Sequence, residues 1–93
     1  MRKDLQVELP ILIEAIKKLG YRKMGRHLEF RRGKYHIILD PKKKRVTLYL
    51  HVDIPVHATP LITYHKARKQ GKDIEQEYRR LKIMLMKIMK GEM

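Results

Sequence analysis

Three side chains on one face of a predicted sheet have the chemistry for proton transfer. His36, Glu29 and Tyr49 fall on neighbouring strands at positions where side chains come within hydrogen-bonding distance. In a ribonuclease, His36 would transfer the proton and Glu29 would set its tautomer, while Arg31 or Lys34 would stabilise the phosphorane. A cross-strand ion pair on a solvent-facing sheet is the commoner use of such residues. We therefore expect no enzyme.

A second group of residues has the chemistry of metal ligands. His51, Asp53 and His57 could gather around one ion, but their spacing matches no specific ligand motif and no fourth ligand is evident. Cysteine is absent, which excludes a thiolate zinc site, a disulfide framework and a thiol nucleophile. Glycine-rich phosphate loops and nucleophile elbows are missing from the sequence as well. We expect no metal, no other cofactor and no small-molecule substrate.

The strongest chemical signal is positive charge in the middle of the chain. The 93 residues include 23 Lys or Arg and 10 Asp or Glu, which gives a formal net charge of +13 at pH 7. Residues 15–52 hold twelve of these cations against two acids, and residues 54–72 hold four against none. A surface that only keeps a protein soluble intersperses the two signs. The excess predicts a polyanionic partner, and a nucleic-acid backbone fits it best.

The candidate nucleic-acid contacts lie on a hairpin tip, on the outward face of the sheet and on a short helix. Lys42 to Arg45 are four consecutive cations at the tip, and Tyr49 offers a ring on which a base could stack. RNA and DNA fit equally well, and an acidic protein is the alternative polyanion. The full set is Arg22, Lys23, Arg26, Arg31, Lys34, His36, Lys42, Lys43, Lys44, Arg45, Tyr49, Lys66, Arg68 and Lys69.

Length and composition limit the class of protein. A chain of 93 residues supports a single core, so we expect one small basic domain over residues 1–93. No uncharged run approaches the roughly 18–20 residues of a membrane span, and no signal sequence is evident, so we expect a cytoplasmic protein. Ser and Asn are absent while Lys, Arg, Glu and Ile are plentiful, a bias typical of hyperthermophiles.

The elements that position these residues begin with a helix and a meander of three antiparallel strands. The helix starts near Glu8 and ends at Gly20, because its apolar residues recur every three or four positions; Asp4 is a possible N-cap. Alternating apolar residues then predict strands over residues 21–31, 34–39 and 45–52.

The register of the meander follows from matching the inward residues of neighbouring strands. A two-residue turn at Arg32-Gly33 pairs Phe30 with Tyr35, and a loop over residues 40–45 pairs Leu39 with Val46. On the outward face this register places Glu29, His36 and Tyr49 in one row, and Arg31, Lys34 and His51 in the next.

The rest of the chain predicts two helices. Pro55 makes residues 54–58 irregular or extended. Thr59 and Pro60 have the types of an N-cap and a first helical residue for a short helix that runs through Arg68 and stops at Gly71. Asp73 begins a longer helix to about residue 90, because Gln76 stands at capping-box spacing from it. The fold class is therefore α+β, in the order α-β-β-β-α-α.

The last helix carries more apolar residues than one buried face needs. Ile83 and Met86 extend the apolar stripe around the helix. Methionines commonly fill irregular gaps in a core, but a second copy of the chain could also cover these two residues. Homodimerisation or docking of another protein through this helix is the main alternative to nucleic-acid binding.

The predicted order of elements is loosely similar to that of the small toxin ribonucleases of the HicA type. The stretch Gly33-Lys34-Tyr35-His36 carries this similarity. That family's pattern has histidine directly after Gly-Ser or Gly-Thr, whereas this chain has Tyr35 at the corresponding place. We assign no family on this basis, and a toxin-type ribonuclease stays the second alternative.

Overall fold

The fold is α+β, as the sequence predicts, but it contains more strands and fewer helices. The computed structural model describes residues 1–25, 27–58, 61–66 and 72–91, and for residues 54–58 and 61–66 it describes the backbone alone. The elements in chain order are β1 (Arg2–Leu5), α1 (Leu9–Lys18), β2 (Arg22–Lys23), β3 (Glu29–Arg32), β4 (Tyr35–Pro41), β5 (Val46–Ala58), β6 (Leu61–Lys66) and α2 (Lys72–Met89).

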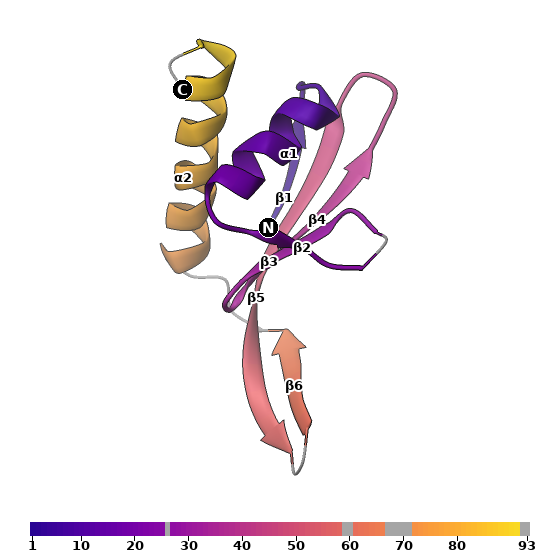
Figure 1. Ribbon diagram of the computed structural model, residues 1–93, viewed down its shortest axis with the longest axis vertical. Coiled ribbons are helices and arrows are strands. Elements are labelled where there is room, and N and C mark those ends of the chain that lie inside the picture. The colour runs from indigo at the N-terminus through magenta and orange to yellow at the C-terminus, as the bar shows by residue number, and fades with distance from the viewer. Residues whose placement is uncertain (26, 59–60, 67–71, 92–93) are drawn as a thin grey trace.

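An antiparallel sheet in the order β1-β5-β4-β3-β2 forms the centre of the molecule. β5 is longer than its neighbours, and its second half pairs with β6 instead of β4. Figure 1 shows that this second half of β5 and β6 form an arm that projects away from the sheet. The basic hairpin tip between β4 and β5 lies at the opposite end of the sheet.

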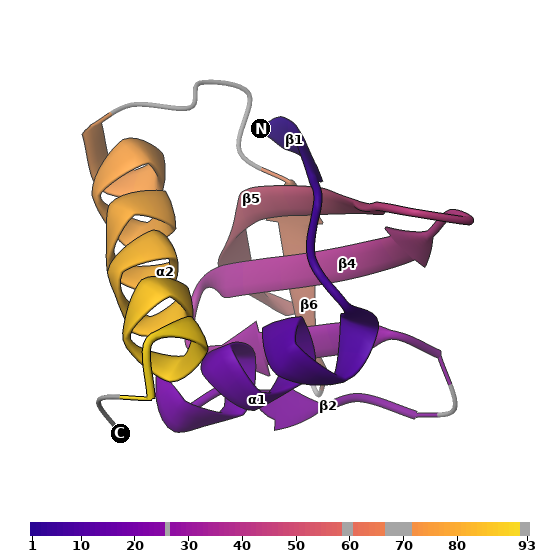
Figure 2. The ribbon, with the colours of Figure 1, turned by 90° about the horizontal axis from the view of Figure 1, so that it is seen from above.

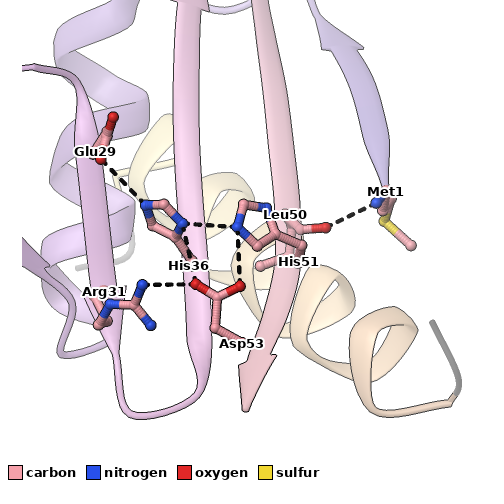
Figure 3. A network of polar contacts seen from close by, with 7 residues as sticks. All are labelled: Met1, Glu29, Arg31, His36, Leu50, His51 and Asp53. Atoms are coloured by element: carbon pink, nitrogen blue, oxygen red, sulfur yellow. Dashed lines mark hydrogen bonds and ion pairs between the residues drawn. The ribbon is translucent and has the colours of Figure 1, made fainter. Parts of the chain in front are cut away.

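The first strand, β1, was not predicted. It pairs with β5, and Asp4 lies within it as the partner of Thr47, so the expected N-cap role of Asp4 is wrong. Thr47 Oγ1 donates a hydrogen bond of 2.7 Å to Asp4 Oδ1, which lowers the pKa of Asp4 below its ordinary value. The amino group of Met1 donates to the Leu50 carbonyl over 2.8 Å and extends the pairing by one residue (Figure 3).

Helix α1 begins and ends as its sequence indicates. Glu8 is the residue before the first helical turn, and Pro10 lies in that turn, where a missing N–H costs nothing. Gly20 follows the helix with φ of +99°, a conformation that side chains disfavour. The predicted span of this helix is therefore confirmed.

Both predicted hairpin registers are wrong by two residues. Arg32 pairs with Tyr35 in the first hairpin, so the turn consists of Gly33 and Lys34. Gly33 has a positive φ of +58° and Lys34 does not, which fits a type II′ turn with glycine at its first central position. In the second hairpin Leu39 pairs with Leu48. Because a shift by two keeps every side chain on its face, the predicted inward and outward sets hold.

The core lies between the inward face of the sheet and both helices. In Figure 2 α1 and α2 lie beside each other on one side of the sheet. The buried residues come from both layers: Leu12, Ala15, Ile16, Tyr21, Phe30, Ile37, Leu39, Val46, Leu48, Leu50, Ile74, Leu81 and Leu85. The two helices therefore leave the outward face of the sheet to other contacts.

The predicted short helix is replaced by a strand. β5 continues through Pro55 to Ala58, and β6 pairs with it along Leu61–Lys66, where a helix was expected. Among the described strands, this part of β5 has a neighbour on one side only, the setting in which a strand tolerates proline. Thr59, Pro60 and Arg68 lie outside the described residues.

Helix α2 matches the predicted last helix closely. It begins at Lys72, so Asp73 lies in its first turn and is not the N-cap that the capping-box spacing suggested. Asp73 instead accepts a hydrogen bond of 3.1 Å from Lys34 Nζ. Within the described parts of the chain, no helix is both long and apolar enough to cross a membrane.

Candidate nucleic-acid interface

The hairpin tip between β4 and β5 presents the clearest group of free cations. Residues 42–45 are all exposed, and the tip is closed by a hydrogen bond of 2.7 Å from Lys42 N to the Arg45 carbonyl. Lys42 Nζ lies 2.9 Å from Asp40 Oδ2. Lys43, Lys44 and Arg45 form no ion pair with any carboxylate in the part of the chain that the structure describes. Three positive charges at the tip are therefore available to a partner.

The tip also lines a groove of about 710 Å³. Its opposite wall is the segment from Gln6 to Pro10, which connects β1 to α1 and begins the helix. Lys42, Lys43, Lys44 and Arg45 all border this space. An elongated polyanion can therefore be contacted by several of the tip side chains at once.

The other predicted cations are only partly placed. Arg22 and Lys23 are exposed on β2, at the edge of the sheet, and neither pairs with a described carboxylate. Lys66 belongs to β6, where only the backbone is described. Arg26, Arg68 and Lys69 lie outside the described residues.

On the outward sheet face, two of the expected phosphate-binding cations are held by carboxylates of the protein. Arg31 Nη2 donates to Asp53 Oδ2 over 2.7 Å, and Lys34 binds Asp73. The hydrogen bond to Asp73 raises the pKa of Lys34 above its ordinary value. The face is therefore less positive than the sequence suggests, although neither helix covers it.

The predicted acid/base row does not form. With the observed register His36 faces Arg31 and His51, while Tyr49 is opposite Ile38 on one side and Arg2 on the other. Glu29 Oε2 still lies 3.4 Å from His36 Nε2, because the two residues are diagonal neighbours. The row fails because both registers differ from the predicted ones by two positions: that of β3 and β4 separates His36 from Glu29, and that of β4 and β5 separates Tyr49 from His36.

A different polar network occupies this face (Figure 3). His36 Nδ1 and His51 Nε2 are 2.8 Å apart, and both lie near the Asp53 carboxylate, at 3.6 and 3.4 Å. Asp53 is buried, and both imidazoles are mostly shielded from solvent. The sequence grouped His51 and Asp53 with His57, whose side chain is outside the described set. In the structure, His36 lies beside His51 and Asp53.

A second buried ion pair was also missed. Arg32 Nη2 binds Glu77 Oε2, and Arg32 Nη1 donates to the Leu19 carbonyl over 2.9 Å. The guanidinium lies over the rings of Tyr21 and Tyr35. Burial raises the pKa of Tyr21, and the charge of Glu77 adds to the shift. Glu77 falls between Ile74 and Leu81 on the apolar face of α2, which is the signal that could have revealed it.

Helix α2 exposes an apolar stripe. Ile83, Met86 and Met89 are 55%, 49% and 59% exposed, which leaves roughly half of each side chain in solvent. Met84 and Ile88 pack against the core instead. The predicted partner-facing residues Ile83 and Met86 are thus on the surface.

Comparisons with known proteins add nothing to this picture: no family model, no curated protein and no solved structure matches the chain. Similarity therefore assigns neither a family nor an activity to it.

Proposed function

We propose that this protein binds the phosphate backbone of a nucleic acid through its hairpin tip. The observation that supports this most is the set of three unpaired cations, Lys43, Lys44 and Arg45, on an exposed turn that borders a groove. Lysine ammonium groups bind phosphates as point charges on flexible stems, so they need no preformed geometry. Backbone binding of this kind carries no sequence preference, and RNA and DNA both supply the phosphates.

Further contacts are expected away from the tip. Arg22 and Lys23 are unpaired among the described residues and lie on the opposite edge strand. Together with some of Arg26, Lys66, Arg68 and Lys69, they would bring the total to about six to eight phosphate contacts. Tyr49 is half-buried, so a stacked base is a secondary contribution.

A salt titration tests the proposal. Fluorescence anisotropy with labelled single-stranded RNA, single-stranded DNA and duplex DNA should show binding at 50 mM salt that weakens steeply with added salt. On duplex DNA the logarithm of the binding constant falls with the logarithm of salt concentration, with a slope of about −0.9 per contacted phosphate. Binding through three tip contacts alone therefore weakens about 40-fold when the salt is raised from 50 to 200 mM. Polyglutamate serves as the acidic-protein control. Absence of binding at 50 mM salt, or equal binding to polyglutamate, would contradict the proposal.

The exposed stripe of α2 favours a second candidate function, self-association. Acidic residues Asp73 and Glu75 lie in the first turn of α2 and Lys87 lies in its last turn. Two copies packed antiparallel about a two-fold axis would bury Ile83, Met86 and Met89 and bring the acidic end of each helix to the basic end of the other.

Substitution in the stripe tests this second candidate. We expect Met86→Glu to convert a dimer into a monomer in multi-angle light scattering, because it buries a charge in the apolar contact. Met24→Glu is the matched control, since Met24 is similarly exposed but lies between β2 and β3. A parent protein that is monomeric at all concentrations would exclude the dimer.

A further inference from the structure

The polar network on the outward sheet face has the arrangement of a metal site, and we propose that His36, His51 and Asp53 bind one divalent transition-metal ion. His36 on β4 and His51 on β5 are direct cross-strand partners. Asp53 follows His51 by two residues, so both side chains point to the same face. Figure 3 shows the three side chains converging on that face, with both helices behind the strands.

The distances between the three ligand groups suit a single ion. Atoms bound at about 2.0–2.1 Å lie about 2.9 Å apart at a right angle and about 3.3 Å apart at the tetrahedral angle. The observed separations are 2.8 Å between His36 Nδ1 and His51 Nε2, 3.4 Å from His51 Nε2 to Asp53 Oδ1, and 3.6 Å from His36 Nδ1 to Asp53 Oδ2. The last of these distances ends on the second carboxylate oxygen of Asp53. One ligand atom from each of the three side chains lies within 4.8 Å of the others, so side-chain rotations would bring all three around one ion.

The neighbours of this cluster orient its ligands. Glu29 Oε2 lies 3.4 Å from His36 Nε2, on the side of the ring away from His51. The negative charge of Glu29 favours a proton on Nε2, although these two atoms form no hydrogen bond in this structure. That tautomer leaves the Nδ1 lone pair directed into the cluster, as in the carboxylate–histidine–metal arrangement. Arg31 holds Asp53 Oδ2 and so leaves Oδ1 free to face His51.

The donor set determines the class of ion. Two imidazoles and one carboxylate suit Zn²⁺, Co²⁺ or Fe²⁺, whereas Mg²⁺ and Ca²⁺ prefer oxygen ligands alone. The side chains of His36, His51 and Asp53 are 12%, 13% and 9% exposed, so an ion can reach them and water can complete its coordination. Arg31 adds a positive charge nearby, which Asp53 and Glu29 offset.

Cobalt spectroscopy tests this proposal on the full chain. After treatment with EDTA and its removal, Co²⁺ should produce visible d–d absorption that saturates at one equivalent and disappears when Zn²⁺ is added. We expect His36→Gln and His51→Gln each to abolish the bands. His27→Gln should retain them, because His27 is an exposed histidine outside the cluster. Glu29→Gln should retain the bands but weaken the affinity about 10–100-fold, the usual effect of losing a residue that orients a ligand.

Several results would overturn the proposal. One is a parent protein that gives no Co²⁺ bands and shows no rise in melting temperature with excess Zn²⁺. Another is a set of bands that persists in both His36→Gln and His51→Gln. Bands lost in His57→Gln but kept in His36→Gln would assign the site to His51, Asp53 and His57 instead. The first of these results is measured on the parent protein. The proposal can therefore be refuted even if a histidine variant folds poorly.

Discussion

A triple alanine variant of Lys43, Lys44 and Arg45 should bind nucleic acid with a weaker dependence on salt. The slope of the logarithm of the binding constant against the logarithm of salt concentration should become less steep by about three. The three side chains form no ion pair with a described carboxylate, and only Arg45 adds a longer-range attraction to Asp4, so their loss removes mainly contacts with the partner. Relative to 1 M salt, three phosphate contacts strengthen binding about 500-fold at 0.1 M salt, and the variant should lose about this factor in affinity there. Anisotropy titrations of the parent and the variant at several salt concentrations would measure both quantities.

The matched control for the tip variant has the same charge change elsewhere. Arg80, Lys87 and Lys90 are exposed on α2 or just beyond it, and replacing all three by alanine also lowers the net charge by three. We expect this control to bind nearly as the parent does, and both triple variants to keep the parent melting temperature. An equal loss in both variants would mean that overall charge, and not the hairpin tip, determines binding. Lys42 is left unchanged because it pairs with Asp40.

The largest effect on stability is expected from Arg32→Ala. This substitution leaves the carboxylate of Glu77, which is 2% exposed, without its charged partner. Removing one member of a buried ion pair costs about 3–5 kcal/mol, and for a domain of this size that lowers the melting temperature by more than about 12 °C. Thermal unfolding followed by circular dichroism would measure the change.

Two companion variants identify the cause of that destabilisation. The double substitution Arg32→Met with Glu77→Leu should recover most of the lost stability, because an apolar pair avoids the buried unpaired charge. Lys34→Ala, two residues further along the same hairpin, removes the exposed pair with Asp73 and should leave the melting temperature nearly unchanged. A loss of less than 1 kcal/mol in Arg32→Ala would refute the interpretation of a buried, required partner.

The sequence predicted which residues face the core more reliably than which residues face each other. The period-two pattern determines the face of a strand, so Phe30, Ile37 and Leu48 are buried as expected. The register depends on the turn, and placing that turn required the preference of a type II′ turn for glycine at its first central position, here Gly33. The acid/base row was lost because this register and that of β4 and β5 each differ from the prediction by two residues.

The elements that the sequence missed depend on contacts distant in the chain. β1 consists of four largely exposed residues whose only strong reason to be a strand is its pairing with β5, more than forty residues away. In the C-terminal half, Thr59 and Pro60 suggested a helix start, but the pairing of β5 with β6 overrides that local signal. The sequence grouped His51 with Asp53, and the structure places these two side by side. His36 joins them only because the observed register pairs it with His51.

The unbroken strand β5 sets the distance between the two proposed binding sites. Val46 follows the basic tip and Asp53 belongs to the histidine cluster, so a rise of about 3.3 Å per residue separates them by roughly 23 Å along one strand. This distance exceeds two Debye lengths at physiological ionic strength, about 8 Å each. Charge brought to one end is therefore screened from the other, and loading the cluster with an ion should leave the affinity of the hairpin tip for polyanions unchanged.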